Sequence, residues 1–219
     1  IRNDRVIWAS CMVACGDADG AVTGNTRRFG ASLEKIKQVV EARSGEIMFG
    51  LNLVVHKGKT IFVGDTSVHE YPNAEQLSEI AISSARVVRL FGFDPKVAFV
   101  SHSTFGQPLT SRTKHIKDAV EILKKKKVNF EFDGDMQPDV ALDEEYKKLY
   151  PFSKIVGNAN ILIMPGQHSA AISYKMMKTL GDTKVIGPLL IGLGLPIEIA
   201  PLRSSTSEII NLASIAAYS

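Results

Sequence analysis

Residues 94–106 read DPKVAFVSHSTFG, and this stretch decides the fold class. An Asp-Pro pair interrupts the preceding helical pattern, and the apolar residues 97–100 then have the length and composition of a short buried strand. A polar loop, residues 101–113, comes next, and a helical pattern continues to about Leu123. A strand, a loop and a helix in this order are the repeating unit of an α/β protein.

The same alternation continues toward the C-terminus, where short apolar runs take turns with amphipathic segments. Parallel-leaning sheets wrapped by helices are therefore expected. The predicted elements are a strand at 129–132, a helix at 139–149, a strand at 161–164, a helix at 170–180, a strand at 185–190 and a helix at 207–217.

Upstream, two β-rich runs precede a long helix. Residues 46–56 and 60–65 are joined through a segment in which Gly58 supplies the backbone freedom of a tight turn, so we predict a β-hairpin. Asn73 can cap the free amides of the helix predicted at 73–91. Further amphipathic helices are predicted at 2–14 and 32–42.

Composition restricts the class of function. With 219 residues, 45% hydrophobic and 22% charged, the chain has the composition of an ordinary globular domain. A net charge of +3 argues against nucleic acid as a partner, and the lysine run at 124–127 is interpreted as a solvated helix end. No apolar run approaches the roughly 18–20 residues of a membrane span, and no signal peptide pattern is present, so a cytoplasmic location is expected.

The metal-binding residue types show no ligand spacing. Cys11 and Cys15 are the two cysteines, and without further partners they form neither a disulfide framework nor a zinc site. The five histidines are scattered, and the acidic residues within 16–20 lack the calcium-loop pattern. We therefore expect no metal site in this chain.

Three loops lead from a predicted strand into a predicted helix, where free amides and the helix dipole favour anions. They are residues 101–106, 164–169 and 201–206, and the last contains Arg203, which can pair with a phosphate. The alternative interpretation is that the Ser and Thr hydroxyls only cap the following helices and that Arg203 is an ordinary surface side chain. The residues alone leave both open.

Longer segments carry a family resemblance. Residues 16–24, 103–104, 132–134, 157–165 and 186–193 together resemble the phosphate acetyltransferase family, and the resemblance runs through essentially the whole chain. The sequence is more similar still to the phosphotransacetylase-like C-terminal module of the hybrid NADP-dependent malic enzymes. The segments that carry this closer resemblance are 1–5, 68–70, 102–106 and 150–152.

The resemblance implies a three-layer α/β/α fold of the isocitrate/isopropylmalate dehydrogenase-like type, with two lobes and an acyl-CoA site in the cleft between them. The first lobe is expected to be truncated here. Residues 1–36 would end the first lobe, residues 37–189 would form the second, and residues 190–219 would return to the first. A dimer formed through the second lobe is implied as well.

The sequence departs from the pattern of active phosphate acetyltransferases. That family carries a Ser-Arg-Gly segment before the final helix and then an Asp, and here Pro201, Leu202 and Glu208 occupy the Ser, Arg and Asp positions. Arg203 comes one residue late. Phe105 follows the Ser-Thr pair where the family has Gly, which adds bulk near the acyl group. We therefore expect a binding module without its own chemistry.

The resemblance predicts a regulatory, oligomer-forming domain in which acetyl-CoA acts as an allosteric effector of a malic-enzyme domain in the same chain. NADP and a divalent metal ion would bind upstream, in the malic-enzyme part. The residues expected to contact acetyl-CoA are Ser103, Thr104, Asn160, Tyr174, Lys175 and Arg203.

Two alternatives remain at this point. The module is a working phosphate acetyltransferase if Arg203 and Glu208 replace the usual catalytic pair after a small local shift. It is only a dimerisation platform if the apolar surface of helix 73–91 and of hairpin 46–65 serves self-association.

Overall fold

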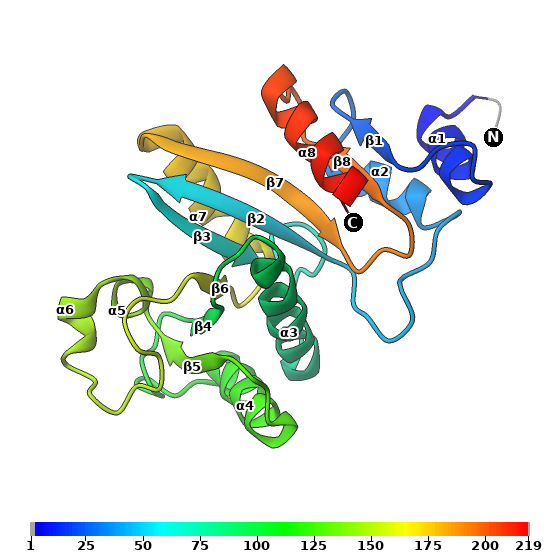
Figure 1. The fold of residues 1–219 in the computed structure, drawn as a ribbon. Helices are drawn as coiled ribbons and strands as arrows, with labels where there is room; N and C mark the ends of the chain where they lie inside the picture. The colour runs from blue at the N-terminus through cyan, green and yellow to red at the C-terminus, as the bar shows by residue number, and fades with distance from the viewer. Residues whose placement is uncertain (1–2, 219) are drawn as a thin grey trace.

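A six-stranded mixed sheet forms the centre of the structure, a computed structural model that describes residues 3–218 (Figure 1). The strand order is β5-β4-β6-β3-β2-β7, with β5, β4, β6 and β3 parallel and β2 antiparallel to both of its neighbours. The predicted α/β class is confirmed. The strands are β2 (Phe49–His56), β3 (Lys59–Gly64), β4 (Lys96–Val100), β5 (Glu131–Met136), β6 (Ile161–Ile163) and β7 (Thr183–Ile191).

The hairpin predicted from the sequence is formed by β2 and β3, which pair from Leu51 with Gly64 to His56 with Lys59. Two residues make its turn, Lys57 with φ 48° and Gly58 with φ 77°. Two consecutive positive φ angles match the twist of the paired strands, and glycine adopts such an angle without steric cost.

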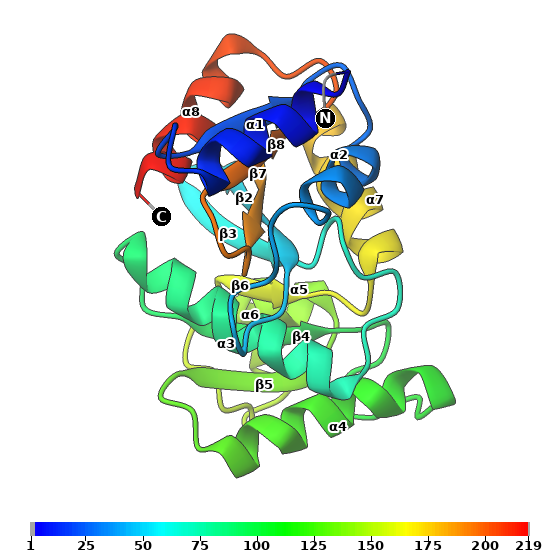
Figure 2. The same ribbon diagram turned by 90° about the vertical axis from the view of Figure 1, so that its right-hand side faces the viewer.

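Helices cover both faces of the sheet (Figure 2). On one face, α3 (Ala74–Leu90), α4 (Ser111–Lys126) and α8 (Thr206–Tyr218) pack over a core that contains Phe49, Phe62 and Phe99. On the other face, α5 (Pro138–Leu142) and α7 (Gln167–Leu180) pack over Val54, Val63 and neighbouring residues. Because buried strands carry apolar side chains on both faces, each face requires its own helix layer.

Local signals set the ends of the long helices. The Asn73 side chain accepts a hydrogen bond from the Gln76 amide, and Gln76 bonds back to the Asn73 amide, so α3 begins with a complete capping box. The predicted start of this helix is confirmed. The lysines at 124–126 form the last turn of α4, where Lys126 pairs with Glu79, so the predicted helix end is confirmed too.

Two sequence-based predictions are wrong in detail. The single helix expected at 139–149 is two short helices, α5 and α6 (Glu144–Lys147), because Asp143 is extended and its side chain caps the Glu145 amide at 2.9 Å. The strand expected at 129–132 is β5, which continues to Met136 through the polar stretch at 133–135. Burial of Asp133 and Asp135 explains why a hydrophobicity pattern stops too early.

The N-terminal helices are shifted from their expected limits. The helix predicted at 2–14 is α1 (Arg5–Ala14), and Arg2 lies outside the described residues. The helix predicted at 32–42 is α2 (Phe29–Ile36), so Val39 and Val40 follow the helix rather than belong to it. Val40 is nevertheless buried in the cluster that contains Leu33 and Ile36, which accounts for its apolar character.

A second, two-stranded sheet was not predicted. It pairs β1 (Ala21–Gly24) in parallel with β8 (Ile197–Ala200), near α1 and α8 at one end of the molecule (Figure 1). Four-residue strands that pair across most of the chain leave almost no local pattern. In the sequence, residues 21–24 and 197–200 therefore read as connecting segments.

The chain passes between the two sheets twice, through residues 37–48 and 192–196. The two passages are hydrogen-bonded to each other: the Arg43 amide donates to the Gly192 carbonyl and the Gly194 amide donates to the Glu41 carbonyl, each at 2.9 Å. Gly192 has φ 81°, and a Cβ there would lie 2.1 Å from the Ile47 carbonyl oxygen. Only glycine fits this close approach of the passages.

Glu198 connects the small sheet with the edge of the large one. It is buried in β8, and its Oε2 accepts a hydrogen bond of 2.9 Å from the Leu190 amide of β7. Burial raises the pKa of the Glu198 carboxyl from its ordinary value of 4.5 to about 8. The protonated, uncharged side chain is therefore the form that the folded protein favours.

We predict that Glu198 makes the protein less stable at high pH. Because the pKa is raised on folding, the folded state holds the proton more tightly, so the free energy of unfolding falls as the pH rises from about 4.5 to about 8. Urea unfolding at pH 6 and pH 8.5 measures this loss, and in Glu198→Gln it should be smaller because the amide does not titrate. An equal loss in both proteins would contradict the assignment.

Apolar surface on α3 is confined to its C-terminal end, where Leu90 is 64% exposed. The apolar stripe of α3, including Leu77, Ile80 and Val88, is buried within the chain. The α7 helix also exposes apolar side chains, Ile172 by 57% and Leu180 by 81%. Among residues 3–218, no helix combines the length and apolar character needed to cross a bilayer. The division into lobes at 36 and 189, and the dimer, stay predictions.

Candidate functional site

A cleft of about 360 Å³ lies where the two sheets and α7 approach one another, and we call it the inter-sheet cleft. One wall comes from the side of the small sheet and the other from the large sheet and α7. The N-terminal wall includes Arg28 and Phe29 at the start of α2, and the C-terminal return adds Pro201 and Leu202. The opposite wall consists of Thr66, Ser67, Gln167, Ala171, Tyr174, Lys175 and Pro188.

A buried carboxylate shapes the loop that brings hydroxyls to the cleft. Asp65 follows β3, and its Oδ1 accepts hydrogen bonds from the amides of Gly50, Ser67 and Val68 at 2.8, 2.9 and 3.1 Å. Its Oδ2 accepts from the His69 amide at 2.7 Å. Charge-assisted bonds of this kind hold a loop in one conformation, which orients Thr66 and Ser67 toward the cleft.

The α7 helix supplies the predicted pair Tyr174 and Lys175, and both line the inter-sheet cleft. Tyr174 packs against the apolar core under α7, and burial raises the pKa of its phenol. Lys175 is exposed, with its Nζ 5.9 Å from the centre of the Tyr174 ring. The structure thus places one apolar anchor and one free cation side by side.

The C-terminal loop presents Leu202 to the cleft, and Arg203 is not among the lining residues. Arg203 is exposed, has φ 60°, and donates its amide to the Asn25 carbonyl at 3.1 Å. Glu208 is held elsewhere, because it accepts hydrogen bonds of 2.7 Å from Lys178 and from the Ser205 amide. Partial burial raises the pKa of Glu208, but these two donors outweigh it and the pKa is lowered.

The charges of the inter-sheet cleft have one sign. Arg28 and Lys175 contribute cations from opposite walls, and no Asp or Glu occurs among the described residues that line it. Ser67 and Gln167 add hydrogen-bonding groups, whereas the Thr66 hydroxyl is directed toward the Gly50 carbonyl and Asn52 Oδ1. Such a lining suits an anion attached to an apolar group.

Ser103 and Thr104 lie away from this cleft, in the loop after β4. The Ser103 hydroxyl is completely buried and donates to Asp135 Oδ2. The Thr104 backbone pairs with Gln107 in a tight loop. Phe105 turns toward Tyr150 and Phe152, with ring centres 5.5 and 4.8 Å away. In this structure these side chains do not join Tyr174 and Lys175.

Asn160 directly precedes β6. It therefore lies at the amino end of the parallel strands, opposite the loops at 101–106 and 164–169. Its Oδ1 accepts from the Lys96 amide at 2.8 Å, and its Nδ2 donates to the Asp94 carbonyl at 2.7 Å. Both bonds fasten the start of β4 to the start of β6. The amide is thus occupied in joining two strands, which is a structural role.

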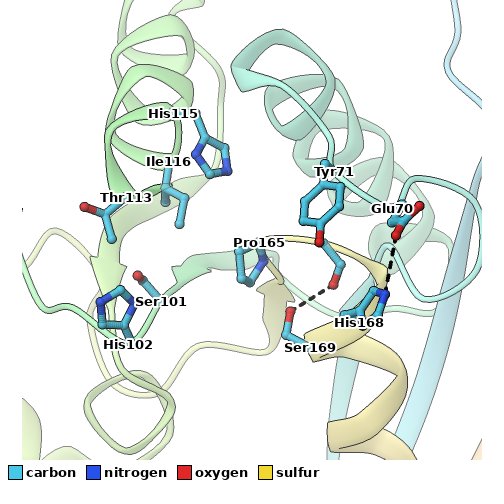
Figure 3. A pocket seen from close by; sticks show the side chains of 11 residues that line it. Glu70, Tyr71, Ser101, His102, Thr113, His115, Ile116, Pro165, His168 and Ser169 are labelled. Carbon is cyan, nitrogen blue, oxygen red and sulfur yellow. Dashed lines mark hydrogen bonds and ion pairs between the residues drawn. The ribbon is translucent and has the colours of Figure 1, made fainter. Parts of the chain in front are cut away.

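The structure also contains a second and larger hollow, of about 660 Å³, which we call the histidine pocket (Figure 3). It opens at the carboxyl ends of the adjacent strands β3, β4 and β6, where ligands commonly bind in α/β sheets. The first turn of α7 separates it from the inter-sheet cleft, with Gln167 lining the cleft and His168 lining the pocket.

The chain is similar to known proteins in both sequence and fold. The model of the phosphate acetyl/butaryl transferase family matches residues 1–217. The chain belongs to that family. A phosphotransacetylase from Streptococcus pyogenes has the same fold, with a TM-score of 0.88 and 29% identity over 96% of this chain and 65% of that one. The predicted phosphotransacetylase-like fold is thereby confirmed.

Two curated relatives of the chain are enzymes of different kinds. It is 43% identical to an NADP-dependent malic enzyme of Rhizobium meliloti over 218 residues, which is 100% of this chain and 29% of that enzyme. It is 30% identical to a phosphate acetyltransferase of Bacillus subtilis over 98% of this chain and 67% of that protein. The chain thus spans less than a third of the length of its malic-enzyme relative.

Sequence reasoning missed Arg28, Thr66 and Ser67 as cleft residues, whereas Gln167 lies in the loop at 164–169 that was predicted to suit an anion. Thr66 and Ser67 follow a predicted strand, so the rule that ligands gather at strand ends identifies them in retrospect. Arg28 had no comparable signal because its place depends on the unpredicted small sheet. Among the described residues, no group of three or more His, Cys, Asp or Glu side chains is positioned to hold a metal ion.

Replacing Asn160 tests its structural role. We predict that Asn160→Ala lowers the free energy of unfolding by about 1–3 kcal/mol, because two backbone groups lose their partner. Denaturant unfolding measures the loss. Binding of any ligand in the inter-sheet cleft should be unchanged for the folded fraction, and a selective loss of binding at unchanged stability would restore Asn160 as a contact residue.

Proposed function

We propose that this chain is the regulatory module of an NADP-dependent malic enzyme and that its inter-sheet cleft binds acetyl-CoA without transferring the acetyl group. The identity with the Rhizobium meliloti enzyme over the whole chain supports the context. The lining of the inter-sheet cleft, cationic on both walls and apolar between them, supports an acyl-CoA as the ligand. Malate, NADP and a divalent metal would then bind in a part of the enzyme outside this chain.

The position of Leu202 is the observation that carries the proposed lack of catalysis. At the site where the family pattern places an Arg for phosphate, an apolar side chain lines the cleft, and Pro201 precedes it. Arg203 is not a lining residue, and Glu208 is bound by Lys178 and the Ser205 amide. An acetyl transfer would thus lack a guanidinium to neutralise phosphate and a free carboxylate to receive the thiol proton.

The inter-sheet cleft fits one end of such a ligand. A volume of about 360 Å³ is at the lower limit of small-molecule sites and encloses only part of a molecule as large as acetyl-CoA. In the proposed arrangement Arg28 and Lys175 bind phosphate groups, while Phe29, Tyr174 and Leu202 contact the apolar part.

The proposal predicts that the protein binds acetyl-CoA but does not catalyse acetyl transfer. We expect acetyl-CoA to bind the purified protein in calorimetry, and the same sample to form no acetyl phosphate from acetyl-CoA and phosphate. Turnover would instead support a working transferase. Absence of both would leave only the role of an assembly domain.

The cation on α7 provides the sharper test. Lys175→Ala should raise the Kd for acetyl-CoA about tenfold, because a hydrogen bond to a charged group contributes about 1.5–3 kcal/mol. Lys178→Ala is the matched control on the same helix, since Lys178 pairs with Glu208 outside the lining of the cleft. Equal weakening in both variants would show a general charge effect and contradict the proposed contact.

Regulation is tested in the full-length malic enzyme. An effector acts only if it binds two conformations of the enzyme with different affinity. Acetyl-CoA should therefore change malic-enzyme activity in the unsubstituted protein and lose this effect in Lys175→Ala, while the activity without effector stays the same. An effect that persists at full strength in Lys175→Ala would place the effector site elsewhere.

A further inference from the structure

The histidine pocket has a wall of aromatic rings that the proposed acetyl-CoA site does not use. Tyr71 and His168 face each other with ring planes only 15° apart and centres 6.4 Å apart. Both side chains are largely exposed, Tyr71 by 75% and His168 by 72%. Exposed, parallel rings beside a cavity offer a surface on which a flat aromatic group packs.

Hydrogen-bond donors suited to an anion lie beside that wall. The amides of His168 and Ser169 are in the first turn of α7, and neither has an acceptor among residues 3–218. His102 and His115 add imidazoles from the other side of the pocket (Figure 3). Glu70 Oε1 lies 3.5 Å from His168 Nε2, and Glu70 is the single carboxylate among the described lining residues.

The floor of the histidine pocket presents an acceptor. Ser103 donates its only hydroxyl proton to Asp135, so in the 2.9 Å contact between Ser101 and Ser103 the donor is Ser101. Ser101 lines the pocket, and its hydroxyl oxygen accepts from the Ser103 amide at 3.3 Å, which leaves one lone pair for a ligand donor. A ligand that matches this floor brings a hydroxyl or amino donor of its own.

Behind this floor, Asp135 is completely buried, and its Oδ1 has no hydrogen-bond partner among the described residues. A buried carboxylate oxygen that lacks a partner is costly, and structures keep one mainly where a function or a bound group compensates. The Ser101–Ser103–Asp135 chain thus joins an unsatisfied acidic group to the surface of the pocket.

From these groups we propose that the histidine pocket binds a nucleoside phosphate. The aromatic wall receives the base, the amides and imidazoles receive the phosphate, and Ser101 accepts from a sugar hydroxyl or an amino group. A cavity of about 660 Å³ has the size of an ordinary small-molecule site. The proposal does not depend on what the inter-sheet cleft binds.

A nucleoside phosphate can reach the pocket as a free nucleotide or as the nucleotide end of a larger molecule such as acetyl-CoA. The first turn of α7 borders both hollows, so the nucleotide end of a ligand bound in the inter-sheet cleft is one candidate occupant of the pocket. The experiment therefore uses AMP and acetyl-CoA as separate probes.

Calorimetric titration of AMP into the purified protein, with no acetyl-CoA present, tests the proposal. We expect AMP to bind, and Tyr71→Ala and His168→Ala each to weaken it at least tenfold. Both side chains are exposed, so neither substitution removes a core residue. Tyr146→Ala, an exposed tyrosine on α6 that does not line the pocket, is the matched control and should bind AMP like the unsubstituted protein.

Failure of AMP to bind, or binding that neither Tyr71→Ala nor His168→Ala weakens, would overturn the proposal. If Tyr71→Ala weakens AMP and acetyl-CoA alike, the pocket holds the nucleotide end of the larger ligand. If it weakens AMP alone, the pocket is a separate nucleotide site. Lys175→Ala separates the two proposals. Lys175 lines the inter-sheet cleft and not the histidine pocket, so this substitution should leave the Kd for AMP unchanged whether or not acetyl-CoA binds in the cleft.

Discussion

The rest of the structure depends on the double passage of the chain between its two sheets. Residues 37–48 and 192–196 run past each other, and two backbone hydrogen bonds join them. Glu198 adds a third connection by accepting from the Leu190 amide at the edge of the large sheet. Because buried polar groups need partners, these contacts hold the small sheet in one position against the large one. The inter-sheet cleft exists only in that position.

The two hollows of the molecule follow from this geometry in different ways. The inter-sheet cleft takes its walls from both sheets, so its cations Arg28 and Lys175 come from distant parts of the chain. The histidine pocket belongs to the large sheet alone, at the carboxyl ends of three adjacent parallel strands. The first turn of α7 borders both hollows, with His168 lining the histidine pocket and Gln167 the inter-sheet cleft.

The family pattern and the structure both support the proposal that the inter-sheet cleft binds a ligand without catalysing a reaction. Leu202 lines the cleft at the position that carries an Arg in the active pattern, and Glu208 is bound by Lys178 and the Ser205 amide. The hydrogen bonds of Asp65, by contrast, keep the hydroxyl loop in shape. A site with an ordered binding surface and no free reacting pair suits a ligand sensor.

The sequence by itself determined the α/β class, the hairpin at Gly58, the capping box at Asn73 and the family, since each rests on neighbouring residues or on motifs read in order. Tyr174 and Lys175, predicted as acetyl-CoA contacts, line the inter-sheet cleft, and their contact with that ligand stays a prediction. Only the tertiary structure decided that β1 pairs with β8, that Asn160 joins two strands, and that Ser103 faces Asp135 rather than the cleft. The physical reason is that these contacts join residues far apart in the chain, and their partners cannot be read from local periodicity.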